Sequence, residues 1–211
     1  MSNDEVDSAL TIPAEKITAK AGRSARTKIR RHPERARPEM AEDILRAGRV
    51  AHIGFAVEGQ PFVIPQTYLY EDGVIYIHAA PASRMQKMLR AGTPVCVEVT
   101  LLDGLVASRN AKSHSLNYRS VVVFGHAEVV QDPTLKRAIF ERMTLRYFPG
   151  RTAGVDYIPA KENDLRTADL HAIVIEELNA KVRSGQPLGT DDGNNSAPGS
   201  SYVLMLSGID S

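Results

Sequence analysis

The spacing of apolar residues predicts a mainly β protein with a few helices between its strands. Apolar, β-compatible runs are found at residues 50–57, 61–70, 74–80, 94–102, 105–108, 118–130 and 170–178. Asp72-Gly73 and Asp103-Gly104 each separate two of these runs, and such dipeptides are typical of hairpin turns. Gly125, inside the longest run, indicates a bend of the kind that small barrels need. Because tight turns pair consecutive strands antiparallel, we expect a closed or partly closed barrel with peripheral helices rather than a doubly wound sheet.

Alternation along the 74–80 run assigns its side chains to two opposite faces. Ile75 and Ile77 share one face, whereas Tyr76 and His78 share the other. In the run before it, Pro65 has no backbone N–H to donate to a neighbouring strand, so it marks an edge, a bulge or an opening.

Helical spacing and helix end signals occur at residues 38–48, 81–91, 132–147 and 161–165. Pro38 and Asp132-Pro133 are start signals, and Gly48 and Gly92 are stop signals.

The 211 residues suffice for one sizeable core. Residues 1–22 are polar without sustained periodicity, and most of residues 186–211 are glycine, serine, asparagine or aspartate. Both are therefore expected to be flexible segments that flank one domain at residues 23–185. Within the tail, the apolar residues Tyr202 to Leu206 are compatible with a short strand that the sequence does not place.

The net charge of +1 gives no global preference for nucleic acid. It conceals a basic segment at residues 20–37 with a net charge of +7, against −6 for the rest of the chain. Such a segment either binds RNA or anionic lipid or forms a solvated arm. The solvated arm is favoured, so nucleic acid is not an expected partner.

Several classes of site and location are disfavoured by the sequence. No apolar run is long enough to span a bilayer and the N-terminus lacks a secretory apolar region, so we expect a cytoplasmic protein without a membrane partner. Cys96 has apolar neighbours, which are typical of a buried, inert thiol. No common metal or nucleophile motif is present, so no metal site is expected.

The helix that follows the Asp72-Gly73 hairpin carries the main candidate chemistry. Ser83, Arg84 and Lys87 place a hydroxyl group and two cations in its first turns, which makes this helix a candidate phosphate site. His78, a few residues earlier, is the histidine best placed to join it. A solvated helix without any ligand explains the same spacing equally well.

A second basic group surrounds the polar loop at residues 109–117 and includes Arg109, Lys112 and Arg119, with Ser120 beside them. If the 118–130 strand lies beside the hairpin, the two groups meet around one anion. Otherwise these charges only solvate a loop.

Short motifs along the chain occur in an order that resembles a known family. They are Arg31-His32-Pro33-Glu34-Arg35-Ala36, Val63-Ile64-Pro65, Ile75-Tyr76-Ile77-His78-Ala79-Ala80, Ser83-Arg84-Met85, Val95-Cys96-Val97, Asp103-Gly104-Leu105-Val106 and Asn117-Tyr118-Arg119-Ser120-Val121-Val122-Val123-Phe124-Gly125. Over residues 23–185 the chain resembles the flavin-nucleotide-binding proteins of the pyridoxamine 5′-phosphate oxidase superfamily, in particular the branch that includes nitroimidazole-resistance reductases. The order and number of the motifs carry the resemblance, because each motif alone is weak.

The resemblance implies an FMN-binding split β-barrel that forms a homodimer and holds FMN at the subunit interface. FAD and haem are less favoured cofactors. The phosphate of FMN is expected near Ser83, Arg84 and Lys87.

The resemblance also implies where the flavin ring lies. The isoalloxazine ring is expected along one stretch of backbone, formed by Val63, Ile64, Pro65, Gln66 and Thr67. Arg119 and Ser120 are candidates for further polar contacts. In the nitroimidazole branch a strand histidine near the flavin has a functional role, and His78 matches that position as the candidate catalytic residue.

Two departures from the family pattern disfavour vitamin B6 oxidation. Met85 stands where the oxidases carry the lysine of Ser-Arg-Lys, and Lys181-Val182-Arg183-Ser184-Gly185 lacks their Arg-x-His pair. We therefore expect an FMN-dependent oxidoreductase that reduces a small organic acceptor. The alternatives are a non-enzymatic flavin- or haem-binding module and, third, a protein that binds nucleic acid through its basic segment.

Overall fold

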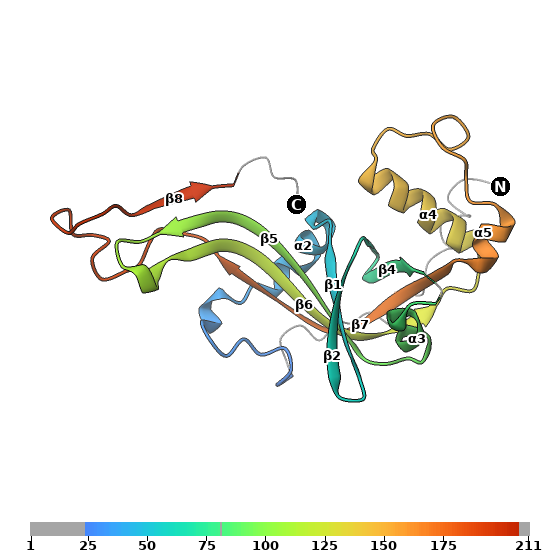
Figure 1. Cartoon of the computed structure of the whole chain (residues 1–211), viewed down its shortest axis with the longest axis horizontal. Coiled ribbons are helices and arrows are strands. Elements are labelled where there is room, and N and C mark those ends of the chain that lie inside the picture. Colours follow the sequence, from blue (N-terminus) through green and yellow to red (C-terminus); the bar gives the residue numbers. More distant parts are fainter. Residues whose placement is uncertain (1–23, 81, 207–211) are drawn as a thin grey trace.

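The computed structural model describes residues 24–80 and 82–206, so the predicted flexible segment at residues 1–22 lies outside the described residues. Its strands are β1 (Ala51–Val57), β2 (Gln60–Gln66), β3 (Leu69–Glu71), β4 (Val74–Ala79), β5 (Val95–Ala107), β6 (Ser115–Val129), β7 (Asp169–Arg183) and β8 (Tyr202–Met205). They form one antiparallel sheet in the order β2-β1-β5-β6-β7-β4-β3, with β8 paired to β5. The long strands β5, β6 and β7 run through the molecule, and the β1–β2 hairpin projects from them (Figure 1). The predicted mainly β, antiparallel fold is confirmed.

Two tight turns set the strand pairing at the ends of the sheet. Glu58 and Gly59 have φ angles of 51° and 82° between β1 and β2, and Asp72 and Gly73 have φ angles of 48° and 76° between β3 and β4. Two consecutive residues with positive φ match the right-handed twist of the flanking strands. The predicted Asp72-Gly73 hairpin is confirmed.

The predicted strand at 61–70 is two strands in the structure. β2 pairs with β1, whereas β3 pairs with β4 at the opposite end of the strand order. The break follows Pro65, and β2 is an edge strand, as a proline inside a strand indicates. Because β2 and β3 are the two ends of the strand order and do not pair with each other, the curled sheet forms a split barrel rather than a closed one.

The predicted Asp103-Gly104 turn is wrong. β5 continues from Val95 to Ala107 with only a shift of register between Leu102 and Gly104, because residues on both sides pair with β6. A Cβ atom at Gly104 would lie 3.0 Å from the carbonyl oxygen of Leu204, so the glycine allows β8 to approach. Asp-Gly serves here as a bulge rather than a chain reversal.

The bend predicted at Gly125 coincides with a second register shift, between Phe124 and Gly125 on β6. A Cβ atom at Gly125 would lie 2.0 Å from the carbonyl oxygen of Val174 on β7. A separation below 3.0 Å cannot be accommodated by backbone atoms without a shift, so only glycine fits this bulge.

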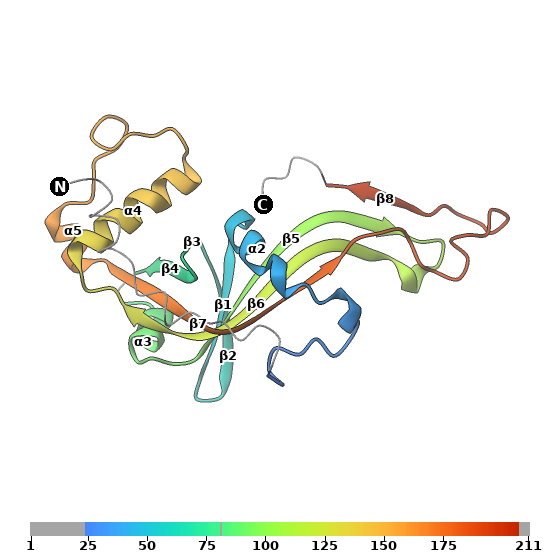
Figure 2. The same ribbon diagram turned by 180° about the vertical axis from the view of Figure 1, so that it is seen from behind.

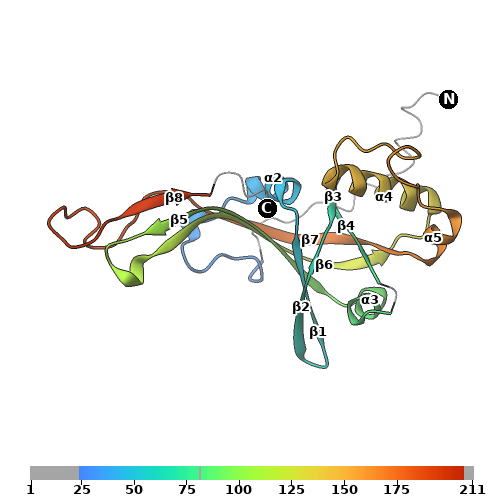
Figure 3. The ribbon, with the colours of Figure 1, turned by 45° about the horizontal axis from the view of Figure 1, so that its top comes forward.

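Helices cover both faces of the sheet. They are the 3₁₀ helices η2 (Pro33–Arg35), η3 (Pro38–Met40) and η4 (Ala111–Ser113) and the α-helices α2 (Ala41–Ala47), α3 (Arg84–Arg90), α4 (Pro133–Tyr147) and α5 (Glu162–Thr167). Side-chain caps start α4 and α3, since Asp132 accepts from the backbone N–H of Thr134 and Ser83 accepts from that of Gln86. Helices α3 and α4 lie on opposite sides of the sheet (Figure 3).

The apolar core is divided between the two faces. The cluster inside the barrel includes Ile75 and Ile77, together with side chains from α2 and α3. The second cluster includes Tyr76 and lies under Ile139 and Met143 of α4. The predicted alternation along residues 74–80, which form β4, therefore places alternate side chains in two separate cores. None of the described helices is long and apolar enough to cross a membrane.

The N-terminal residues 24–37 lie along the C-terminal half of β7 (Figure 2). The backbone N–H of Arg37 donates to Ala180 at 2.9 Å, and the Nζ of Lys181 donates to the carbonyl of Arg31 at 3.0 Å. At the other end of the chain, β8 gives the Tyr202 to Met205 stretch a position beside β5.

Candidate functional site

A cavity of about 220 Å³, here called the α3 cavity, lies between β2 and the start of α3. It is lined by Phe55, Phe62, Ile64, Gln66, Ala80, Ser83, Arg84 and Met85. The fold therefore brings together four of the residues that the sequence singles out: Ile64, Gln66, Ser83 and Arg84.

Apolar side chains form the wall of the α3 cavity. The rings of Phe55 and Phe62 stack with their centroids 5.7 Å apart and an interplanar angle of 20°. Alternation along β2 places Phe62, Ile64 and Gln66 on one face, and Met85 closes the wall from α3. The sequence interpretation missed Phe55, Phe62 and Met85, although the same alternation from Ile64 points to Phe62.

The polar groups of the α3 cavity are few and they converge. The Oγ of Ser83 accepts a hydrogen bond of 3.1 Å from the backbone N–H of Gln86, which leaves its own O–H to donate. The guanidinium of Arg84 lies 4.3 Å from the centroid of the Phe62 ring. Arg84 has no ion pair with any described residue, so its charge is held in place by an aromatic face and is available to an anion.

Four other predicted cofactor contacts do not line the α3 cavity. Val63, Pro65 and Thr67 are exposed, and along β2 Val63 and Pro65 alternate with the lining residues Ile64 and Gln66. Lys87 is an exposed residue of α3 that neighbours Arg84 on the helix surface and points differently from Met85, but it does not line the cavity. For these residues the role at a flavin stays a prediction.

Arg119 and Ser120 lie on β6 opposite Val182 and Lys181 of β7. Arg119 donates from Nε and Nη2 to both carboxylate oxygens of Asp103, at 2.7 to 3.2 Å, and this ion pair raises its pKa. Because β6 lies between β5 and β7, it is not beside the β3–β4 hairpin. Within one chain the two basic groups therefore do not meet around one anion.

His78 points toward α4 rather than into the barrel. Its ring contacts Phe140 edge to face, with centroids 5.8 Å apart and an interplanar angle of 75°. The residue keeps an exposed edge, but partial burial lowers its pKa. His78 does not line the α3 cavity, so its catalytic role also stays a prediction.

A second, shallower depression adjoins the α3 cavity on the outer side of the β1–β2 hairpin. This aromatic groove has a volume of about 540 Å³. It is lined by Arg26, His52, Gly54, Phe55, Ala56, Pro61, Phe62, Val63, Pro94, Val95, Cys96, Glu98 and Phe124. Phe55 and Phe62 belong to both, so the groove and the α3 cavity share a wall. Cys96 is half-buried in this groove rather than fully buried as predicted, and this partial burial raises its pKa, which favours the thiol over the reactive thiolate.

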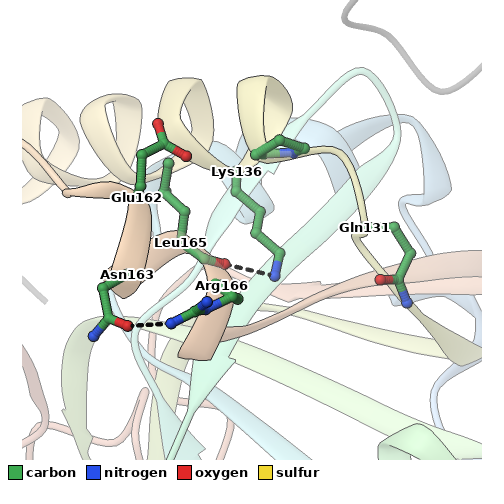
Figure 4. A pocket seen from close by; sticks show the side chains of 7 residues that line it. Gln131, Lys136, Glu162, Asn163, Leu165 and Arg166 are labelled. Atoms are coloured by element: carbon green, nitrogen blue, oxygen red, sulfur yellow. Dashed lines mark hydrogen bonds between the residues drawn. The ribbon is translucent and has the colours of Figure 1, made fainter.

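A further cavity of about 630 Å³ lies between α4 and α5 and contains none of the predicted site residues (Figure 4). Lys136, which is 7% exposed, donates from Nζ to the carbonyls of Leu165 at 2.9 Å and Ala168 at 3.0 Å. These carbonyls belong to the C-terminal end of α5, where a cation is favourable. Lys136 thus has a structural role in holding α5 against α4.

No cluster of metal-ligating side chains is found among residues 24–80 and 82–206. The α3 cavity itself is an apolar slot with one amide, one hydroxyl and one guanidinium that has no ion pair with a described residue. Such a site suits a flat organic ligand that carries a phosphate group.

Solved structures that resemble this chain over most of both chains include two flavin-related proteins. The flavocytochrome Anf3 from Azotobacter vinelandii is 31% identical, with a TM-score of 0.77 over 87% of this chain and 85% of that one. The FAD and haem binding protein from Mycobacterium smegmatis is 27% identical, with a TM-score of 0.73 over 82% of this chain and 84% of that one. A putative 5-nitroimidazole antibiotic resistance protein from Bacteroides thetaiotaomicron shares the fold, with 21% identity and a TM-score of 0.56 over 69% of this chain and 84% of that one.

A comparison with curated protein sequences finds no match. The sequence profile of the pyridoxamine 5′-phosphate oxidase family, in contrast, matches residues 37–182. This range contains all the strands of the barrel from β1 to β6 and nearly all of β7. The chain therefore belongs to the pyridoxamine 5′-phosphate oxidase family of split β-barrel proteins.

Proposed function

We propose that the protein binds FMN at the α3 cavity and uses it to reduce a small organic acceptor. The observation that carries the proposal is the free guanidinium of Arg84 at the mouth of an aromatic-walled cavity. Two relatives support a flavin, since one is a flavocytochrome and the other binds FAD and haem.

The residues of the cavity fit the two ends of FMN. Arg84 and the O–H of Ser83 would bind the phosphate, because a guanidinium and a hydroxyl match its oxygens. Phe55, Phe62, Ile64 and Met85 would exclude water from the ring. Gln66 and the backbone of the edge strand β2 would supply hydrogen bonds to the polar edge of the ring.

The volume of the cavity supports a site that is completed by a second subunit. About 220 Å³ lies below the ~300 Å³ at which small-molecule sites typically begin. The exposed Val63 and the aromatic groove lie directly beside it and would be covered in a dimer. We therefore infer a homodimer in which the partner subunit covers the flavin ring.

When bound, the flavin supplies the electrons for reduction of the acceptor. The protein would hold the ring along β2 and keep one of its faces open to a small substrate. Partial burial lowers the pKa of His78, which disfavours the imidazolium form that a proton donor needs. His78 would therefore donate a proton only if the partner subunit brings it to the flavin and a negative charge there stabilises its protonated form.

The absorbance spectrum of the purified protein tests flavin binding. The expected result is a pair of flavin bands, one of them near ~450 nm, in the protein as isolated or after reconstitution with FMN. The reductase activity is tested separately: the reduced protein should be reoxidised by a nitroimidazole under anaerobic conditions, faster than free reduced FMN. Flavin bands without such reoxidation would show that the protein binds flavin and would refute the proposed reductase activity.

A haem-binding module is the second candidate. The aromatic groove of about 540 Å³ is large enough for an extended apolar ligand, and His52 lies at its rim. The Nδ1 of His52 is 3.2 Å from a carboxylate oxygen of Glu98, an arrangement that orients a histidine for iron ligation through Nε2. A Soret band that is lost in His52→Ala would support this candidate, and reconstitution with haemin that yields no Soret band would exclude it.

A further inference from the structure

A pocket of about 370 Å³ lies where the N-terminal residues meet the end of β7, away from the α3 cavity. Here called the arginine pocket, it is lined by Glu34, Arg35, Arg37, Val182, Arg183, Ser184, Gly185, Gln186 and Leu188. It shares no residue with the α3 cavity, the aromatic groove or the cavity beside α5. Within one chain, a ligand of this pocket is therefore separate from the α3 cavity.

Arg183 is the central group of the pocket. It is only 7% exposed, although it carries a permanent charge. Its Nη1 donates to the side-chain oxygen of Asn117 and, at 3.4 Å, to the carbonyl of Leu116, and its Nη2 lies 3.5 Å from the carbonyl of Gln186. These oxygens are all uncharged, and Arg183 has no ion pair within the described part of the chain.

A buried charge without a counter-ion is costly, because desolvation is not offset by an opposite charge. Burial lowers the pKa of Arg183, and the neighbouring guanidinium of Arg35 lowers it further. Two cations that are close enough to affect each other's charge thus line the same pocket.

The acidic groups nearby pair with Arg35 and Arg37 only at long distance and through exposed carboxylates. Glu34 is the one carboxylate among the lining residues, and its Oε1 lies 3.8 Å from Arg35 and 3.0 Å from His32. The Nη1 of Arg37 donates to two backbone carbonyls, at 2.9 and 2.7 Å, and its Nε is 4.0 Å from an exposed carboxylate of Glu39. Among the lining side chains, three guanidinium groups therefore meet a single exposed carboxylate.

We propose that the arginine pocket binds the phosphate group of a small phosphorylated molecule, held between Arg35 and Arg183. An arginine fork can bind two oxygens of a phosphate or of a carboxylate, and two guanidinium groups together favour a dianionic phosphate over a carboxylate with a single charge. The volume of about 370 Å³ leaves room for an organic moiety against Val182 and Leu188, within the usual range of small-molecule sites. This assignment does not rest on flavin binding, because it uses no residue of the α3 cavity.

The arrangement gives part of the basic N-terminal segment a specific role. Arg26 of this segment is used elsewhere, since it pairs with Glu176 and Glu177 and stacks on Phe124. Arg35 and Arg37, in contrast, lie beside the buried Arg183. The ligand is therefore expected to be a compact phosphate ester rather than a nucleic acid spread along the whole segment.

Calorimetric titration of the full chain with phenyl phosphate, at constant ionic strength, tests the proposal. Arg35→Gln should weaken the binding of phenyl phosphate about tenfold or more, the usual effect of removing a charge-assisted contact. Arg30→Gln is the matched control, because Arg30 is exposed, belongs to the same segment and does not line the pocket. It should leave the affinity unchanged. Equal thermal midpoints of the three unliganded proteins would show that the variants are folded.

Four outcomes would overturn the proposal. Wild-type protein that does not bind phenyl phosphate at millimolar concentration has no such site. Equal losses of phenyl phosphate affinity in Arg30→Gln and Arg35→Gln would indicate that the charge of the whole basic segment, rather than the pocket, attracts the phosphate. Preferential binding of a single-stranded oligonucleotide would then point to a nucleic acid as the ligand. Loss of phenyl phosphate binding in Arg84→Ala, with Arg35→Gln unaffected, would move the phosphate to the α3 cavity. Binding of benzoate as tight as that of phenyl phosphate would refute the preference for a dianion.

Discussion

Replacement of Arg84 by alanine is the sharpest perturbation of the proposed flavin site. Arg84 is the first residue of α3 and is exposed, so alanine, a strong helix former, should leave the fold intact. The variant removes a charge-assisted contact to the FMN phosphate, worth about 1.5–3 kcal/mol. We therefore expect Arg84→Ala to weaken FMN binding roughly ten- to a hundredfold.

Riboflavin separates the phosphate contact from other effects, because it has the ring without the phosphate. Arg84 also lies over the Phe62 ring at 4.3 Å, and an exposed cation–π contact of this kind is worth about 0.5–1 kcal/mol. Loss of that contact would affect both flavins equally, by no more than about fivefold. Riboflavin affinity should therefore fall much less than FMN affinity.

Fluorescence titration of apo protein with both flavins gives the two affinities. Arg84→Lys retains the charge but not the fork, so its FMN affinity should lie between those of wild type and Arg84→Ala. Lys87→Ala is the matched control on the same helix. Because Lys87 does not line the α3 cavity, its loss should cost less than that of Arg84. Unchanged FMN affinity in Arg84→Ala, or an equal fall for both flavins, would refute the phosphate assignment.

Three other predictions follow from the fold and its surfaces. Gly125→Ala should lower the free energy of unfolding by about 1–3 kcal/mol in urea titrations, because its Cβ would meet the Val174 carbonyl, whereas Gly193→Ala, with open space around it, should have little effect; equal stabilities would show that the bulge adapts. Cys96 should react with iodoacetamide more slowly than a free thiol at pH 8, because burial raises its pKa, and the rate should rise with pH; a rate equal to that of free cysteine would contradict the buried thiol. Light scattering at micromolar concentration should give twice the chain mass of 23.1 kDa, and a monomeric mass would refute the shared flavin site.

Local signals in the sequence predicted most of the barrel. The Asp72-Gly73 turn and the alternation of Ile75, Tyr76 and Ile77 are properties of adjacent residues, so they are readable without the rest of the chain. Asp103-Gly104 misled because the same dipeptide serves as a turn or as a bulge, and the pairing of distant strands decides between them. Here β6 continues along both sides of the dipeptide, which no local pattern reports.

The candidate site was predictable only in part, for the same reason. Ser83 and Arg84 stood out because they share one helix start, and the fold does bring them to Ile64 and Gln66. The sequence left open whether Arg119 would join them, and the strand order places β6 away from the β3–β4 hairpin, with Arg119 paired to Asp103. Side chains that line a cavity from distant strands, such as Phe55, carry no local mark of that role.

The buried state of Arg183 was equally invisible in the sequence. In the sequence, Arg183 is notable only because the stretch that contains it, residues 181–185, lacks the Arg-x-His pair of the oxidases. Its burial arises from the packing of residues 24–37 against the end of β7, which depends on contacts across about 150 residues of chain, such as that between Lys181 and Arg31. The gathering of three guanidinium groups around one pocket is therefore a property of the tertiary structure.

A crystal structure of the protein with FMN tests the central claim most directly. The account predicts electron density for the flavin between β2 and α3, with the phosphate bound to Arg84 and Ser83 and a second subunit covering the ring. A flavin bound elsewhere, or a phosphate whose oxygens contact neither Arg84 nor Ser83, would contradict it.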